Sequence, residues 1–315
     1  MSPPPPPSVA PRPGPVSPPQ ARRPDTESQT PALFRARMLP PLIQELERSM
    51  EFDSGLPPAI RRAGREAVGL EGSRRGSLWR PLLTLAAERA CGGEDTRALG
   101  VAAAIELTHT ASLVLDDLPC MDDAEERRGS PATHCSIGPA ASMLLAIGLL
   151  GRSAELLAAA PRGGARLVRR WGAAFGLSGM AGGQAVDVTG AFERGGAARR
   201  LHRRKTTELS ALAVWSGSVV ANASSDTQAR LYRFGRDLGW AYQLADDARD
   251  LDEDRDLGRG PGGRSPARQS HRLLRRSLTH LQGAGPDLDP AGIELLRHLA
   301  LEIVRPPSAP APISR

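Results

Sequence analysis

Apolar residues recur every three to four positions over most of the chain, which is the spacing of helices that pack one face into a core. Alternation of apolar and polar residues, the pattern of strands, is scarce. Helices are predicted over residues 34–46, 81–90, 101–115, 140–160, 167–176, 209–223, 228–251, 272–281 and 291–304. The sequence therefore predicts a single all-α domain of about ten helices, with inner helices surrounded by outer ones.

Three segments are apolar on most of their faces, near residues 105–115, 143–150 and 209–221. A helix that is apolar all round is expected inside a protein. The longest apolar run, Pro139 to Gly151, is shorter than the ~20 residues that a membrane-spanning helix needs. We therefore expect interior helices and no transmembrane segment.

Proline crowds both ends of the chain. Residues 1–36 contain few large apolar side chains, so they cannot bury enough surface to offset their conformational entropy. We predict a disordered Pro-rich tail over residues 1–36, one domain over residues 37–304, and a second disordered tail over residues 305–315.

Charge and cysteine content exclude several classes of protein. The formal net charge is +6, yet 40 of the 41 basic residues are arginines spread over the whole chain, and Lys205 is the one lysine. Aromatic residues make up 3% of the chain, too few for a base-stacking platform, so no nucleic-acid partner is predicted. The three cysteines form no CxxC pair, which argues against a disulfide scaffold and a zinc ribbon and favours a reducing, cytoplasmic compartment.

Two of the apolar helices end in acidic clusters, which is unusual because a buried carboxylate needs a partner. In the second cluster, Asp250 lies about 40° from Asp246 and about 60° from Asp247 around a helix, so all three share a face with Gln243. Carboxylates on one face repel unless a hard cation such as Mg²⁺ bridges them. In the first cluster, Pro119 interrupts the helix and lets Asp122 fold back towards Asp116. Two such clusters facing each other would hold several Mg²⁺ ions around a diphosphate.

These motifs carry a family resemblance. DDLPCMDD followed by RRGSPATH resembles the first aspartate-rich motif of the trans-isoprenyl diphosphate synthases, the polyprenyl synthetase family, and DDARD resembles the second. GMAGGQAVDV and LHRRKTTEL, between them, resemble two further family motifs. The set occurs in the family's order and is similar to geranylgeranyl and farnesyl diphosphate synthases, so the resemblance spans residues 37–304.

The resemblance implies a helical bundle with a central cavity and a condensation of an allylic diphosphate with isopentenyl diphosphate. The implied Mg²⁺ ligands, with Mn²⁺ as a substitute, are Asp116, Asp117, Asp122, Asp246, Asp247 and Asp250. The residues implied to bind the allylic diphosphate or to act in catalysis include Arg127, Lys205, Thr206 and Gln243, beside Asp116, Asp117 and Asp246. Those implied for the second substrate and the reaction centre are Arg80, His109, Arg128 and Gln184. The resemblance also implies a homodimer.

Product length is implied by two small residues. Ala111 and Ser112 stand about one turn before Asp116, where by resemblance a bulky aromatic residue stops chain growth. Because a ring there would overlap the next five-carbon unit, small residues leave room. We expect a product of C20 or longer, and a shift towards C15 in Ala111→Phe.

The sequence also departs from the family. Ser77 stands where the family's GGKxxRP element has its lysine, and the segment after Gly258 is short. Two alternatives therefore stay open: a terpene-synthase-like enzyme that ionises an allylic diphosphate without condensation, and a degenerate regulatory subunit. An unrelated helical metal phosphohydrolase would need clustered His and Asp ligands, which the sequence lacks.

Overall fold

The computed structural model describes residues 30–52, 54–72, 76–94, 96–190, 196–256, 265–282 and 288–304. Within these ranges twelve α-helices and one short antiparallel hairpin form the fold, so the all-α prediction is confirmed. The helices are α1 (Pro31–Ser49), α2 (Pro58–Val68), α3 (Trp79–Ala90), α4 (Leu99–Asp116), α5 (Thr133–Ile137), α6 (Pro139–Ala158), α7 (Gly164–Phe175), α8 (Met180–Val188), α9 (Gly196–Val220), α10 (Ser225–Asp256), α11 (Pro266–Thr279) and α12 (Pro290–Val304). The hairpin strands are β1 (Glu126–Arg127) and β2 (Ser130–Pro131).

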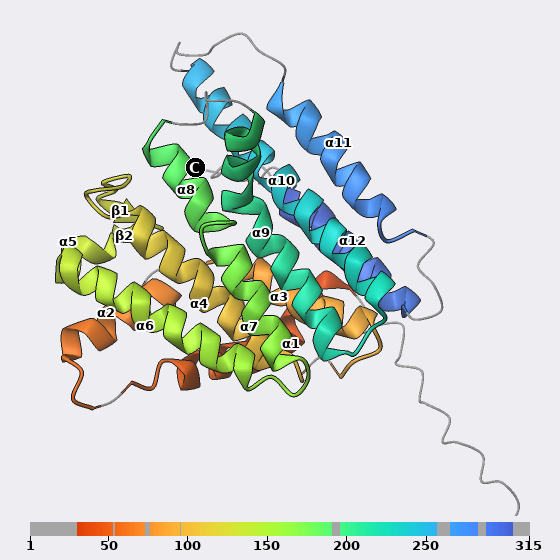
Figure 1. Cartoon of the computed structure of the whole chain (residues 1–315), viewed down its shortest axis with the longest axis horizontal. Helices are drawn as coiled ribbons and strands as arrows, with labels where there is room; N and C mark the ends of the chain where they lie inside the picture. Colours follow the sequence, from red (N-terminus) through yellow and green to blue (C-terminus); the bar gives the residue numbers. More distant parts are fainter. Residues whose placement is uncertain are drawn as a thin grey trace, which may run out of the picture.

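The helices surround a central group made of α4, α9 and α10 (Figure 1). Helix α9 packs against α10, α3 and α8, and α4 packs against α6 and α3. Helices α6 and α11 lie on opposite outer sides, α6 against α4 and α11 against α10 (Figure 1). The hairpin and α5 follow the C-terminal end of α4, so the first acidic motif lies at that end of the bundle.

The prediction of interior helices holds for two of the three segments. Helices α4 and α9 bury nearly all their apolar side chains, as at Leu107 and Val214, both inaccessible to solvent. The segment near residues 143–150 is different, because Leu144 and Ile147 on α6 are 66% and 63% exposed. Helix α6 buries Leu145 and Leu149 in the core and turns a second apolar face outward. The prediction that α6 lies in the interior, made from apolar residues on all its faces, is therefore wrong.

Helices α4 and α6 are each long and apolar enough to cross a membrane by length and composition alone. Helix α6 has 20 residues and extends beyond the apolar run that ends at Gly151. Core helices of soluble proteins have the same length and composition, and α4 is mostly buried inside the bundle. The expectation that the chain has no transmembrane segment stays a prediction. The cytoplasmic location also stays a prediction; Cys91, Cys120 and Cys135 are free thiols in the structure.

The N-terminal boundary of the domain differs from the predicted one. Helix α1 begins at Pro31, and Phe34 and Met38 are buried in the core. The Thr30 hydroxyl accepts a hydrogen bond from the Leu33 amide, and proline is tolerated in the first helical turn. The folded domain therefore starts about six residues before position 37, because the prolines there open a helix instead of extending the tail. The rest of the two predicted tails, residues 1–29 and 305–315, lies outside the described residues.

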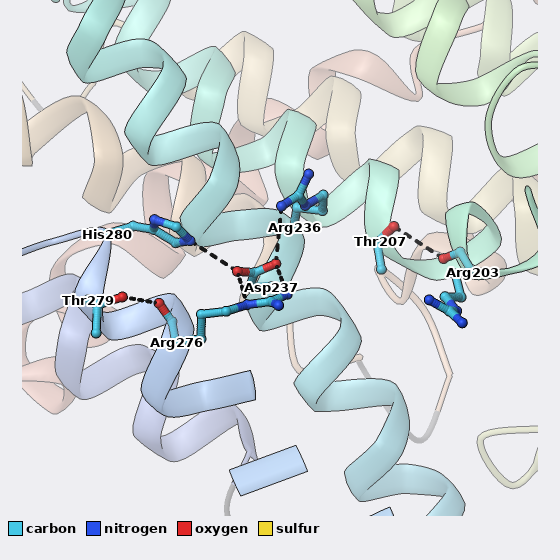
Figure 2. A network of polar contacts seen from close by, with 7 residues as sticks. All are labelled: Arg203, Thr207, Arg236, Asp237, Arg276, Thr279 and His280. Carbon is cyan, nitrogen blue, oxygen red and sulfur yellow. Dashed lines mark hydrogen bonds and ion pairs between the residues drawn. The ribbon is translucent and has the colours of Figure 1, made fainter. Parts of the chain in front are cut away.

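A buried carboxylate joins α10 to α11 (Figure 2). Asp237 is 1% exposed and accepts hydrogen bonds from Arg276 Nε at 2.8 Å and Nη2 at 2.7 Å. His280 Nε2 lies 3.0 Å from Asp237 Oδ2, the oxygen that also accepts from Arg276 Nε. Burial alone would raise the pKa of Asp237, but the hydrogen bonds from Arg276 and His280 outweigh it and hold the pKa below its ordinary value. This polar joint fixes the outer helix against the helix that carries the second acidic motif.

Candidate active site

A cavity of about 490 Å³ opens between α4, α8, α9 and α10. This volume is in the range of ligand pockets, which span roughly 300–1,000 Å³. Charged and polar groups line part of it, and apolar side chains line the rest. The lining includes Arg80, His109, Ser112, Asp116, Met121, Phe175, Met180, Gln184, Val188, Lys205, Thr206, Leu209, Tyr242 and Gln243.

The first acidic motif begins where α4 ends at Asp116. The Asp122 amide donates a hydrogen bond to the Asp116 carbonyl oxygen at 2.9 Å, so the predicted fold-back of this segment is confirmed. Burial raises the pKa of the Asp116 carboxyl to about 6, while Lys205 opposes the shift and Asp122 and Asp117 add to it. The carboxylate at the cavity end of α4 is therefore short of positive charge.

Asp117 does not join Asp116 in the cavity. Its buried carboxylate accepts hydrogen bonds from Arg127 Nε at 3.0 and 3.1 Å and from Arg127 Nη2. Both residues line a second, smaller cavity on the other side of α4. Consecutive helical residues point about 100° apart, which is why the two aspartates face different cavities. The predictions that Asp117 holds a metal and that Arg127 reaches the allylic diphosphate are therefore not supported, and Asp117 instead fixes the hairpin.

Lys205 and its partner lie at the same end as Asp116. Lys205 Nζ is 3.0 Å from Asp187 Oδ2, an ion pair between α9 and α8. Asp187 belongs to the GGQAVD motif, and no pattern in the sequence singled it out. Its position suggests that it orients the lysine when no anion is bound.

A short hydrogen-bonded chain connects α9 to the second acidic motif on α10. The Thr206 hydroxyl donates to Gln243 Oε1 at 3.1 Å, and Gln243 Nε2 donates to Asp247 Oδ1 at 2.8 Å. Thr206 and Gln243 line the cavity, as predicted. Asp246 lies next to Asp247 in the same helix, and the side chain of Asp250 lies outside the described residues.

Within the described part of the chain, no group of three or more His, Cys, Asp or Glu side chains is arranged to hold a metal ion. The donors nevertheless suit Mg²⁺, because carboxylate oxygens are its preferred protein ligands. The raised pKa of Asp116 indicates a carboxylate that a cation would stabilise. Asp116, Asp122, Asp246 and Asp247 are the described residues that fit this group.

The other polar part of the cavity contains a buried arginine and a histidine. Arg80 Nη1 lies 3.1 Å from His109 Nε2, and the Arg80 guanidinium stacks over the Trp79 ring at 4.2 Å. Burial, followed by the charge of Arg80, lowers the pKa of His109 well below its ordinary value. His109 is therefore neutral and accepts the hydrogen bond from Arg80. Burial also lowers the pKa of Arg80 to about 10, opposed mainly by Glu106, a buried carboxylate that the sequence analysis did not single out.

Arg128 lies beside this pair but lines the second cavity. Its backbone has φ 59°, a left-handed conformation that a non-glycine residue adopts rarely. A Cβ atom at Gly76 would lie 2.7 Å from the Arg128 guanidinium, so a larger residue there would displace the end of that side chain. Ser77, next to Gly76, is exposed and supplies no cation.

Two further predicted residues differ in their surroundings. Both polar side-chain atoms of Gln184 are buried in the cavity wall and have no hydrogen-bond partner among the described residues, as expected of a group that contacts a ligand. Ser112 lines the cavity, and its hydroxyl donates to the His109 carbonyl oxygen at 2.8 Å. Ala111 is fully buried in the main core and is not part of the cavity lining. The expectation that Ala111 forms the cavity floor is thus not supported.

Helices α8 and α9 approach closely at Gly183. A Cβ atom there would lie 2.8 Å from the Lys205 amide nitrogen and 2.9 Å from the Leu201 carbonyl oxygen. The backbone of α8 therefore rests directly on the backbone of α9. The cavity wall that α8 forms and the lysine that α9 carries are held in one unit.

The chain is similar in sequence and in fold to known proteins. The family profile described as Polyprenyl synthetase matches residues 66–262. The chain is 34% identical to the geranylgeranyl diphosphate synthase of Pantoea ananas over 66% of its own length and 76% of the relative. It is also 34% identical to the farnesyl diphosphate synthase of Bacillus subtilis (strain 168), over 68% and 74% of the two chains. The apo structure of a FPP/GFPP synthase from Zymomonas mobilis superimposes with a TM-score of 0.73 at 26% identity, covering 88% of this chain and all of that one.

Proposed function

The chain belongs to the polyprenyl synthetase family and is a polyprenyl diphosphate synthase, and we propose that it uses Mg²⁺ to build a product of C20 or longer. The family substrates are an allylic diphosphate and isopentenyl diphosphate. The observation that carries the proposal is a cavity with Asp116, Lys205 and Gln243 at its polar end and apolar side chains along the rest of its wall. Condensation is the shared activity of such relatives, which sets aside the alternatives of ionisation alone and of an inactive subunit.

We assign the polar groups to the departure of the allylic diphosphate. Lys205, released from Asp187, would hold the diphosphate by its positive charge. Thr206 and Gln243 would contact the diphosphate, and the hydrogen bond between them holds their side chains in place. When bound, Mg²⁺ or Mn²⁺ held by the carboxylates of the two motifs supplies positive charge that stabilises the leaving group.

The second substrate would bind at Arg80 and His109. A neutral histidine beside a buried arginine suits a diphosphate. Arg80 supplies the positive charge, and the neutral His109 adds no second positive charge that would repel it. Gln184 would complete the reaction centre with its unpartnered amide. The isopentenyl double bond attacks the allylic cation, and the departing diphosphate is available as the base for the last proton. The apolar lining excludes water, which would otherwise quench the cation.

The lining near Asp116 supports the proposed product length. Ser112 is small and faces the cavity one turn below Asp116, so it leaves the allylic tail free to extend. Incubation of the protein with Mg²⁺, a labelled allylic diphosphate and isopentenyl diphosphate should give diphosphates of C20 or longer. Ser112→Phe should shift the product towards C15, because a ring there occupies the space of the next unit. Mainly C15 from the wild type would contradict this product length, and hydrocarbons or free diphosphate alone would contradict condensation.

Ser77 predicts a weak site for isopentenyl diphosphate. A charge-assisted hydrogen bond contributes roughly 1.5–3 kcal/mol, so a clamp that lacks one cation should have a KM about ten- to a hundredfold higher. Ser77→Lys should lower the KM for isopentenyl diphosphate by that factor and leave the KM for the allylic substrate unchanged. Steady-state kinetics with each substrate varied separately measures both values. An unchanged KM for isopentenyl diphosphate would mean that its diphosphate does not lie near residue 77.

We also propose that the protein is a homodimer joined through α6. Its outer face exposes Met143, Leu144 and Ile147, and the nearby Gly148 and Gly151 have open space around them. Contiguous exposed apolar residues of this kind are typical of interaction sites. Sedimentation equilibrium should give twice the chain mass for the wild type and a lower mass for Leu144→Glu. A wild-type monomer at micromolar concentration would exclude this interface.

A further inference from the structure

Helix α11 has one buried side and one strongly basic side. Its buried side packs on α10. Its outer side exposes Arg268, Arg272 and Arg275, which we call the α11 face. These three residues lie within about 60° of one another around the helix axis and span about 10 Å along it. Residues 265–282 contain no aspartate or glutamate, so the outer side of α11 carries positive charge alone.

The arginines of the α11 face have no counter-charge. They form no ion pair and no hydrogen bond with any residue that the structure describes. Exposed arginines elsewhere are paired, as Arg62 is with Glu66 and Arg97 is with Glu94. The fourth arginine of α11, Arg276, is also paired, with the buried Asp237. The α11 face is therefore a row of unneutralised guanidinium groups.

The α11 face is accessible and points toward one end of the cavity. Helix α11 lies on the side of the bundle opposite α6, so the proposed dimer through α6 leaves it uncovered (Figure 1). The Ser270 hydroxyl donates to the Ala241 carbonyl oxygen at 2.6 Å, and Arg276 donates to Asp237. Residue numbers thus rise along α11 as they fall along α10, which makes the two helices antiparallel. The first turn of α11 therefore lies toward the end of α10 that carries Asp246.

The chemistry of the α11 face fits phosphate groups. A guanidinium can donate two parallel hydrogen bonds to phosphate oxygens. Helix α11 contains no aromatic residue on which a nucleic-acid base could stack. It also exposes no large apolar side chain of the kind that anchors a protein partner. Charge without stacking rings or apolar anchors is complementary to a bilayer surface, where many phosphate headgroups lie in one plane.

We propose that the α11 face binds anionic phospholipid headgroups and holds the protein at a membrane surface. The choice of a bilayer over other polyanions also rests on the proposed function, because a diphosphate with a tail of C20 or longer is an amphiphile that enters bilayers. A protein bound in this way releases its product beside the phase that takes it up. The attraction is electrostatic and exposed to solvent, so salt weakens it.

Sedimentation with vesicles tests the proposal on the full chain without substrate. At low salt the wild type should bind vesicles of mixed phosphatidylcholine and phosphatidylglycerol. It should bind neither these vesicles at high salt nor vesicles of phosphatidylcholine alone. One arginine near an anionic surface strengthens binding by about fivefold. Arg268→Gln, Arg272→Gln and Arg275→Gln should therefore each weaken binding by about fivefold, and the triple α11 variant by about a hundredfold.

The matched control removes three exposed arginines that already have partners. It combines Arg48→Gln, Arg62→Gln and Arg97→Gln, whose arginines pair with glutamates. It changes the net charge by the same amount as the triple α11 variant and should bind vesicles as the wild type does. Both triple variants should keep the helix content of the wild type. Without vesicles, both should condense the two substrates at the wild-type rate, because none of the six arginines lines the cavity.

Failure of the wild type to bind anionic vesicles at low salt would overturn the proposal. Equal binding by the triple α11 variant would also overturn it, as would an equal loss in the control, which would mean that total charge attracts the vesicles. Stronger binding to double-stranded DNA than to vesicles, lost in the triple α11 variant, would replace the bilayer by a nucleic acid. Vesicle binding without condensation would instead reject the proposed function, so the two failures are distinguishable.

Discussion

Replacing Asp116 or Asp246 by Asn should each lower the rate of allylic ionisation by about a thousandfold, since one preorganised electrostatic contact is worth about 10²–10³ in rate and loss of a cation site removes more than one. The asparagine keeps the shape of the side chain and loses its charge. The Asp116 carboxyl already has a raised pKa because of burial, so it is the group that gains most from a bound cation. Release of labelled diphosphate in single-turnover experiments measures this step directly.

Asp123→Asn is the control for these variants. Asp123 is adjacent to Asp122, is exposed and has φ 49°, a conformation that asparagine tolerates. It should retain wild-type turnover, and all three variants should keep the helix content of the wild type. Full turnover of the wild type in excess chelator would contradict the role of a divalent cation. Equal losses in all three variants would show that the two acidic motifs act through their overall charge.

Replacing Asp237 by Ala should lower the free energy of unfolding by about 3 kcal/mol, because hydrogen bonds to a charged group contribute roughly 1.5–3 kcal/mol. The change removes the acceptor that Arg276 and His280 share and separates α11 from α10 (Figure 2). Thermal unfolding should shift down by roughly 6–12 °C at about 2–4 °C per kcal/mol. Asp226→Ala removes an exposed ion pair with Arg230 on the same helix and should cost less than about 1 kcal/mol.

The same joint predicts a dependence on pH. The pKa of Asp237 is lower in the folded protein than the ordinary aspartate value, so its contribution to stability is present above that ordinary value, about 3.9. The contribution is lost as the pH falls through the folded-state pKa. Chemical denaturation of wild type and Asp237→Ala should therefore give well separated curves at pH 7 and converging curves below about pH 4. Curves that stay equally separated in acid would mean that the charge of Asp237 does not matter.

Periodicity and stop signals were enough to predict the helical fold, because helix spacing is a local property of the chain. They were not enough for α6, whose outward face is as apolar as its inward face. A sequence does not reveal whether apolar residues meet the chain's own core or another surface. The same limit explains the N-terminal boundary, where the prolines near Pro31 are typical of a tail and yet begin a helix that buries Phe34.

The residues of the site could be found from motifs, but their directions could not. Asp116 and Asp117 are neighbours in sequence and face different cavities, and of the neighbours Ala111 and Ser112 one is buried in the main core and the other lines the cavity. Phe175 belongs to no quoted motif and reaches the cavity only through the packing of α7. Glu106 had one available signal, since a carboxylate within an apolar run is expected to need a buried partner.

The contact at Gly183 fixes the distance between the cavity wall that α8 forms and the lysine that α9 carries. In the proposed reaction, Lys205 would hold the diphosphate of the substrate, and α8 lines the part of the cavity that would take its apolar tail. The contact joins main-chain atoms of the two helices. The distance between α8 and α9 therefore stays constant when side chains at either end change rotamer. A larger residue at position 183 would therefore move this cavity wall away from the lysine.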